Sequence, residues 1–108
     1  MRNLLKETTE AIADEGHTVE DVQWVGAVID SEEEGWSCSW QEFEKEADLT
    51  YHAGYGGQEI NEYLLVVGSN WWLERHEYDG RERWEHKTLP MRPARHRKAS
   101  LLSREYMR

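Results

Sequence analysis

The chain has 108 residues, of which 38% are hydrophobic and 32% are charged. This length suits one domain around one hydrophobic core and excludes a multidomain machine. The longest uncharged apolar run, residues 63–68, is far shorter than the ~20 residues that cross a membrane. The N-terminus turns acidic before any apolar stretch, unlike a secretory signal, so we expect a soluble cytoplasmic protein that does not bind membranes.

The charge is unevenly distributed along the chain. Residues 1–90 carry 21 acidic and 7 basic side chains, a net charge of −14, whereas residues 91–108 carry 1 and 6, a net charge of +5. An acidic body repels phosphate backbones and attracts basic surfaces. We therefore expect a basic protein surface as the partner and no direct contact with nucleic acid.

The first half of the chain predicts one helix, one strand and the start of a second helix. Asn3 can cap a helix over residues 4–15, which Gly16 ends. Residues 22–29 are β-rich and apolar on both faces, which indicates a central or covered strand. The acidic stretch 30–35 indicates a loop. Ser39 and Glu42 form a capping-box pattern that predicts a second helix from residue 40.

The second predicted helix carries an apolar stripe at helical spacing. Its members are Trp40, Phe43, Ala47 and, if the helix continues that far, Tyr51. The glycine-rich segment 54–57 ends this helix in a shaped loop. It lacks the pattern of a phosphate-binding loop, because no GxGxxG and no Lys-Ser/Thr ending is present.

The second half of the chain predicts three strands, over residues 60–68, 71–78 and 81–89. Asp79-Gly80 is a strong signal for a tight hairpin between the last two. A two-residue loop places Tyr78 opposite Arg81, whereas a three-residue loop with a glycine bulge places Glu77 opposite Arg81. The second register pairs opposite charges, so it is weakly favoured.

These elements predict an α+β fold, with a small antiparallel sheet of three or four strands and two packed helices. Residues 1–90 form the single domain, since Pro90 marks the end of the folded body. Residues 91–108 form a basic C-terminal tail that is either disordered or a short docking helix.

No residue pattern in the chain indicates an enzyme. Glu44, Asp48 and His52 have the spacing of a shared helical face, and His76 and His86 lie on opposing predicted strands, but ordinary surface roles explain both patterns better than a metal site does. The single cysteine, Cys38, has no histidine base at a catalytic spacing and is best read as a small apolar filler. We expect no catalysis, no cofactor and no metal.

The six tryptophans are the most unusual feature of the composition. Trp24, Trp40 and Trp84 suit the core or sheet packing. The adjacent Trp71 and Trp72 point to opposite faces if they lie in a strand, which puts one of them at risk of exposure. An exposed tryptophan beside charged residues is typical of an interaction hot spot, although ordinary burial under a helix or the tail explains it as well.

Three segments together resemble a family of small acidic proteins encoded by phages and prophages, whose function is unknown. The segments are residues 54–60 (GYGGQEI), 65–68 (LVVG) and 71–80 (WWLERHEYDG), with Trp84-Glu85 following. The resemblance spans roughly residues 19–90 and does not include the tail. It implies the cytoplasm of a bacterial host as the location, and it supplies no catalytic residues.

The phage context favours a stoichiometric inhibitor, because small acidic phage proteins often bind host defence complexes that handle nucleic acid, such as CRISPR effectors. A carboxylate-rich body can compete for a basic groove, while aromatic residues supply specificity. The alternative is a self-associating accessory or adaptor protein, with a homodimer as its simplest form. The candidate partner-binding residues are Glu32, Glu33, Glu34, Glu42, Glu44, Glu46 and Asp48 for charge, and Trp71, Trp72 and Tyr78 as anchors.

Overall fold

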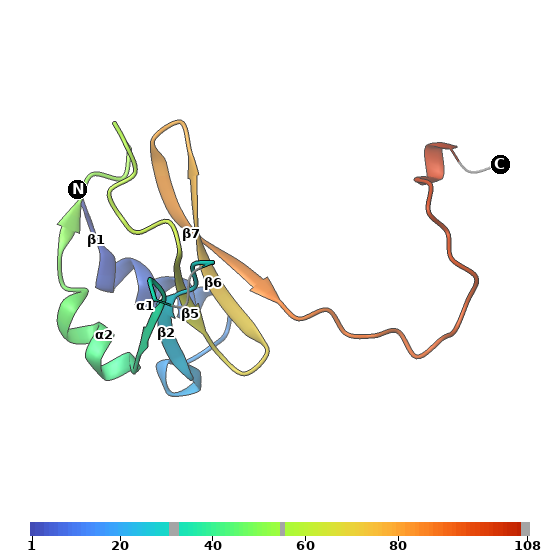
Figure 1. Ribbon diagram of the computed structural model, residues 1–108, viewed down its shortest axis with the longest axis horizontal. Helices are drawn as coiled ribbons and strands as arrows, with labels where there is room; N and C mark the ends of the chain where they lie inside the picture. Colours follow the sequence, from blue (N-terminus) through green and yellow to red (C-terminus); the bar gives the residue numbers. More distant parts are fainter. Residues whose placement is uncertain (31–32, 55, 107–108) are drawn as a thin grey trace.

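The computed structural model describes residues 1–30, 33–54 and 56–106. It confirms the α+β class, but the sheet has more strands than predicted. Five antiparallel strands lie in the order β3-β2-β5-β6-β7, and β1 and β4 form a separate pair (Figure 1). The bounds are β1 Arg2–Asn3, α1 Leu4–Asp14, η1 Val19–Asp21, β2 Trp24–Ala27, β3 Trp36–Cys38, α2 Trp40–Glu46, β4 Thr50–Tyr51, β5 Leu64–Val67, β6 Trp71–Tyr78, β7 Arg81–Thr88 and η2 Arg104–Tyr106.

Helix α1 begins and ends where the local sequence predicts. The Asn3 side chain accepts a hydrogen bond from the Lys6 backbone N–H at 3.0 Å, which satisfies one of the free donors of the first turn. Gly16 adopts a positive φ of 78° just after the helix, a conformation that glycine adopts readily. The helix buries Leu4, Thr8 and Ile12 against the sheet.

Helix α2 begins as predicted but ends earlier than the apolar stripe suggests. The Ser39 side chain accepts from the Glu42 N–H at 3.1 Å, as expected of the cap. After Glu46 the chain is diverted, because Ala47 and Leu49 offer their carbonyls to the N–H groups of Leu5 and Leu4. Thr50–Tyr51 then pairs with Arg2–Asn3 as a strand. Residues 47–51 therefore form hydrogen bonds with the N-terminal segment instead of continuing the helix.

The predicted strand positions are largely confirmed, but short partners were missed. Strand β2 lies between β3 and β5, and β5 lies between β2 and β6, in agreement with their apolar sequences. The three-residue β3 and the two-residue β1 and β4 carry too little periodicity to be recognised from sequence. They form because a neighbouring strand offers hydrogen-bonding groups.

The hairpin between β6 and β7 has the two-residue loop, so the weakly favoured bulged register is wrong. Tyr78 pairs with Arg81, and Glu77 pairs with Glu82. Asp79 and Gly80 have φ values of 52° and 80°, as a type I′ turn requires. The two glutamates tolerate each other because each has its own partner: Glu77 accepts from the Gly80 N–H at 2.7 Å, and Glu82 turns inward toward Arg75.

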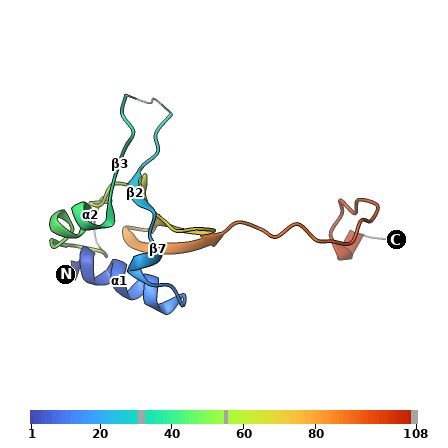
Figure 2. The same cartoon turned by 90° about the horizontal axis from the view of Figure 1, so that it is seen from below.

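The core lies on one face of the sheet only. It combines Val25, Val66 and Leu73 of the sheet with side chains of both helices, including Ile12 and Phe43. Figure 2 shows α1 on one side of the sheet, while the segments that leave β2 and enter β3 extend away on the other. We call the helix-bearing side the covered face and the opposite side the open face.

Beyond β7 the chain extends away from the body (Figures 1 and 2). The described residues from Leu89 to Glu105 are exposed, and this segment, residues 89–106, carries most of the basic charge of the C-terminal tail. Within the described part of the chain, no helix is long and apolar enough to span a membrane.

Candidate protein-binding surface

The open face of the sheet presents an apolar row across three strands. Trp24 pairs with Val67, and Val67 pairs with Trp72, so these side chains project from the same face. Leu65 lies in the next row on that face, opposite Gly26. All four apolar side chains remain partly accessible, and none belongs to the buried core. This row is the main apolar feature that neither helix covers.

The two adjacent tryptophans lie on opposite faces, as the strand period predicts. Trp71 is 1% exposed, its indole N–H donates to Asp21 at 2.5 Å, and its ring stacks on His17. The prediction that Trp71 is a partner anchor is therefore wrong, because the covered face encloses it. Trp72 lies on the open face, where its indole N–H donates to Glu74 at 2.8 Å, and it stays a candidate.

Tyr78 is 76% exposed at the hairpin end of β6. It lies six residues from Trp72 along the same strand, about 20 Å at the rise of an extended chain. The two side chains are too far apart to contact a single residue of a partner. Tyr78 belongs to a contact surface only if that surface extends along the hairpin.

A shallow apolar hollow lies at the edge of the sheet formed by β2 and β3, where Trp36 pairs with Ala27 and so starts from the covered side. Trp24, Val28, Ile29 and Trp36 contribute to its lining. Gly26 permits this close packing, since a Cβ at that position would lie 2.3 Å from the Trp36 carbonyl oxygen and 3.0 Å from the Trp24 ring. Val28 and Trp36 remain well exposed, and Trp24 belongs to both the hollow and the row, so the hollow adds apolar contact area at the β2–β3 edge.

The predicted acidic candidates lie at the border of this surface and around α2. Glu33 and Glu34 are exposed in the connection between β2 and β3, and Glu32 lies outside the described residues. Glu42, Glu44 and Glu46 are exposed on α2, whose opposite side buries Trp40 and Phe43. Among the described residues, no ion pair involves these five glutamates. Asp48 is also exposed and accepts from the Asn3 side-chain amide at 2.8 Å.

An acidic group around Tyr63 was missed from the sequence. Glu62 raises the pKa of the Tyr63 phenol through its charge and a hydrogen bond, and Asp30 and Glu34 add to the effect. Three carboxylates therefore act on a half-exposed aromatic ring just before β5. The tyrosine follows Glu62 in sequence, but its approach to Asp30 and Glu34 depends on the pairing of β2 with β5.

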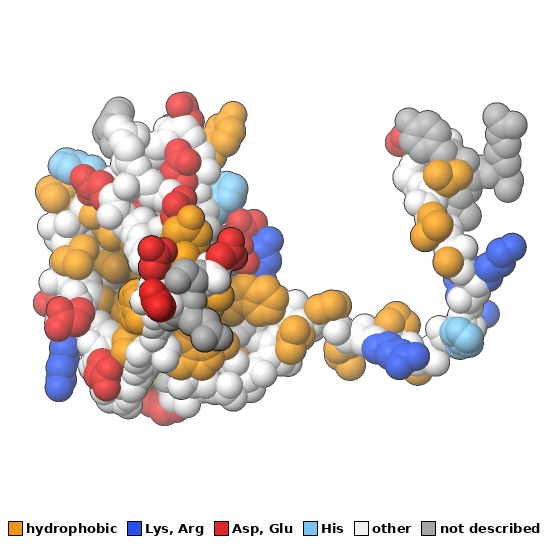
Figure 3. Space-filling view, in the orientation of Figure 1, with side chains coloured by type: hydrophobic (Ala, Val, Ile, Leu, Met, Phe, Trp, Pro, Cys, Tyr) orange, Lys and Arg blue, Asp and Glu red, His pale blue; other side chains and the backbone are white. Residues whose placement is uncertain are grey.

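The space-filling view shows how these groups are distributed (Figure 3). Hydrophobic side chains gather over the central strands, and acidic side chains surround them on this face of the body. Blue basic side chains are sparse on the body and are concentrated along the extended tail. The geometry therefore gives an apolar centre with exposed acids in the β2–β3 connection and mixed charges along β7, where Lys87 lies opposite Trp72. A charged border around an apolar centre matches the core-and-rim anatomy of protein interfaces.

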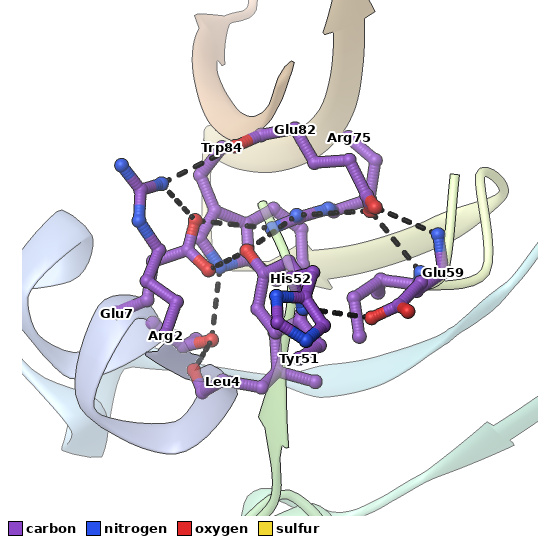
Figure 4. Close-up of polar contacts among 11 residues, drawn as sticks. Arg2, Leu4, Glu7, Tyr51, His52, Glu59, Arg75, Glu82 and Trp84 are labelled. Atoms are coloured by element: carbon purple, nitrogen blue, oxygen red, sulfur yellow. Dashed lines mark hydrogen bonds and ion pairs between the residues drawn. The ribbon is translucent and has the colours of Figure 1, made fainter. Parts of the chain in front are cut away.

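The covered face contains a charged network that fixes the hairpin to the rest of the body (Figure 4). The Arg75 guanidinium contacts Glu82 at 3.5 Å and Glu7 at 3.3 Å, and it donates to the Tyr51 hydroxyl at 3.0 Å. It also lies 4.7 Å from the centre of the Trp84 ring. The Arg75 and Glu82 side chains are fully enclosed, so the pair acts within the fold.

Glu82 connects this network to the loop that precedes β5. Its two carboxylate oxygens accept from the Glu59 and Ile60 backbone N–H groups at 2.7 and 3.1 Å. Tyr51 also donates to Glu7, which in turn accepts from Arg2 at 3.2 Å. One buried ion pair therefore orders segments from both ends of the folded chain.

The sequence patterns considered for metal or thiol chemistry do not form sites. Helix α2 ends at Glu46, so Glu44 and His52 do not share a helical face. In the described ranges, no group of three or more His, Cys, Asp or Glu residues could hold a metal ion. His76 pairs with Arg83 rather than His86. Burial raises the pKa of the Cys38 thiol, and the Glu42 charge raises it further, so the reactive thiolate is disfavoured.

Comparison of the chain with protein-family models, curated proteins and solved structures gives no match. The geometry of the open face and the charge of the body are therefore the features that bear on function.

Proposed function

We propose that this chain is a phage-encoded protein-binding module that inhibits a host nucleic-acid-binding complex stoichiometrically. The observation that carries the proposal is the uncovered apolar row of Trp24, Val67 and Trp72. It lies on an acidic body whose exposed Glu33 and Glu34 enter no ion pair among the described residues. Tryptophan on a rigid strand offers a large contact area with little loss of side-chain entropy. The surrounding acids favour a basic partner and disfavour an acidic one.

The distribution of charge supports a competitive mode of inhibition. A net charge of −14 over residues 1–90 draws the body to a cationic groove of the kind that normally holds DNA or RNA. Tyr63, with Asp30, Glu34 and Glu62 around it, suits an arginine of such a groove, because a guanidinium both pairs with carboxylates and stacks on aromatic rings. The inhibitor then occupies the groove in place of the nucleic acid.

A competition measurement tests this function. A labelled guide RNA or target DNA is bound to purified CRISPR effector complexes of the bacterial host, and its release is followed by fluorescence anisotropy as the full-length chain is added. We expect one complex to release its nucleic acid at one equivalent of protein. If no effector complex releases its ligand at micromolar protein, inhibition of this class of complex is wrong.

Variants of the open face show whether the proposed surface is responsible. Trp72→Ala should weaken inhibition about 30-fold, the effect of losing a central aromatic contact. Glu33→Gln/Glu34→Gln should weaken it about threefold to tenfold at low salt and reduce its salt dependence. The matched control is Glu10→Gln/Glu20→Gln, which makes the same charge change at exposed positions near α1 and should leave inhibition unchanged.

The open face also supports the alternative of self-association. An apolar row on an uncovered sheet can pack against the same row of a second copy, which gives a twofold dimer. Light scattering over a concentration series distinguishes the two functions. A dimer that Trp72→Ala converts to a monomer supports self-association, whereas a monomer at all concentrations excludes it.

A further inference from the structure

Two histidines that are 69 residues apart in sequence meet at the edge of the covered face. His17 follows α1, and His86 lies on β7. Their Nε2 atoms form a hydrogen bond with a separation of 3.0 Å, and both residues are partly buried. From the sequence, His76 is the histidine considered as a possible second metal ligand beside His86. In the structure, the histidine that contacts His86 is His17.

The His17 ring is held in place by its neighbours. The His17 backbone N–H donates to the Ile12 carbonyl at 3.0 Å, and the His17 ring stacks on Trp71 with a centroid distance of 4.1 Å and an interplanar angle of 5°. Trp71 is itself fixed through its hydrogen bond to Asp21. The packing of the covered face therefore fixes the position of the contact between the two Nε2 atoms.

A carboxylate stands behind one of the two rings. The Glu15 Oε2 atom lies 3.4 Å from His86 Nδ1. A carboxylate at Nδ1 favours the tautomer with the proton on that atom, which leaves the Nε2 lone pair free for a Lewis acid. Carboxylates hold metal-binding histidines in this way and raise their basicity.

The separation of the two nitrogens suits two neighbouring positions around one metal ion. Nitrogens at about 2.1 Å from a metal are about 3.0 Å apart at a right angle and about 3.4 Å apart at a tetrahedral angle. The observed 3.0 Å matches the right angle, and an ion that binds both nitrogens would replace the direct hydrogen bond between the two rings. Right-angled nitrogen positions are typical of Ni²⁺ and Cu²⁺ rather than of structural Zn²⁺.

We propose that His17 and His86 form a two-imidazole binding site for a divalent transition-metal ion of the Ni²⁺ or Cu²⁺ class, with Glu15 orienting His86. Within the described residues no third protein ligand joins them, so water completes the coordination. The ion ties the end of α1 to β7 across the covered face. This site is independent of the proposed inhibition.

Isothermal titration of the untagged full-length chain with Ni²⁺ tests the site. We expect one equivalent to bind, with affinity at least about tenfold lower in His17→Phe and in His86→Ala. His17→Phe keeps a ring against Trp71 while removing the nitrogen, so it separates ligation from packing. Glu15→Gln should weaken binding about tenfold through the loss of the orienting carboxylate.

His52→Ala and His76→Ala are the matched controls, because both histidines lie in the body outside this pair. A second readout is the electron paramagnetic resonance spectrum of the Cu²⁺-loaded chain, which should show two imidazole nitrogens in the wild type and one in His17→Phe. Circular dichroism checks that each variant folds. If the one-equivalent binding of Ni²⁺ persists in the folded double variant His17→Phe/His86→Ala, or is absent from the wild type, the proposed site is wrong.

Discussion

The two faces of the five-stranded sheet carry similar residue types, but one face encloses these side chains and the other leaves them accessible to solvent. The covered face encloses a tryptophan, an arginine and a glutamate, each with defined partners. The open face carries Trp72, Arg83 and Glu85 on the same two strands, but leaves them accessible to solvent. Residue type alone therefore does not assign a role, because the position of the two helices decides which side chains stabilise the fold and which remain available for binding.

The largest expected effect comes from breaking the enclosed ion pair. Arg75→Met should lower the free energy of unfolding by about 3–5 kcal/mol, because it leaves the Glu82 carboxylate buried without its cation. Urea denaturation measures the change. Arg83→Met is the matched control on the open face and should stay within about 0.5 kcal/mol of the wild type. Equal losses in the two variants would contradict the distinction between the faces.

The adjacent tryptophans give a direct comparison of the faces. Trp71→Ala should cost about 3–5 kcal/mol of stability, as expected for an aromatic side chain removed from a core. Trp72→Ala should cost about 1 kcal/mol, since that ring is only partly buried, while it reduces partner binding. Thermal unfolding and the competition measurement together test the pair, and the reverse order of stability would show that the faces have been assigned wrongly.

A smaller loss is expected from tight packing around Trp71. At Gly68, a Cβ would lie 2.1 Å from the Trp71 ring. Gly68→Ala should therefore cost about 1–3 kcal/mol through overpacking. Gly57→Ala is the control, because a Cβ there has nothing within 4 Å. Chemical denaturation of both variants checks the prediction, and a stable Gly68→Ala protein would mean that the covered face can relax.

Alkaline pH should weaken the covered face. Burial is the main cause that raises the pKa of Tyr51, and the hydrogen bond to Glu7 raises it further. The folded state then holds the phenolic proton more tightly than the unfolded state. Stability is therefore full below the ordinary tyrosine pKa of about 10 and is lost as the pH rises from there through the raised pKa of the folded state. Tyr51→Phe should reduce this loss in denaturation experiments from about pH 8 to about pH 10.5. An unchanged pH dependence would contradict this contribution of Tyr51.

The smallest effect is a local shift on the open side. Glu62→Gln should lower the pKa of Tyr63 toward its ordinary value, because the charge that raises it most is removed. Ultraviolet titration of tyrosinate, compared between this variant and Glu10→Gln, measures the shift. The fold should be unaffected, since Tyr63 is half exposed. If the two variants titrate alike, the acidic group around Tyr63 does not form in solution.

The sequence by itself determined the features that depend on neighbouring residues. The Asn3 and Ser39 caps follow from short-range hydrogen bonding, and the opposite orientations of Trp71 and Trp72 follow from the strand period. The Asp79-Gly80 turn follows from the backbone angles that these residues tolerate. The stripe of Trp40, Phe43, Ala47 and Tyr51 is buried as predicted, although Tyr51 reaches the core from a strand.

Only the tertiary structure decided the features that need partners distant in the chain. The early end of α2, the pairing of β1 with β4 and the burial of Trp71 each depend on a segment far away in sequence. The same is true of the Arg75 network, the acids around Tyr63 and the meeting of His17 with His86. The hairpin register places Glu82 where its carboxylate accepts from the backbone of Glu59 and Ile60. Local patterns record the preferences of the backbone, whereas these contacts form between groups that only the folded chain brings within hydrogen-bonding distance.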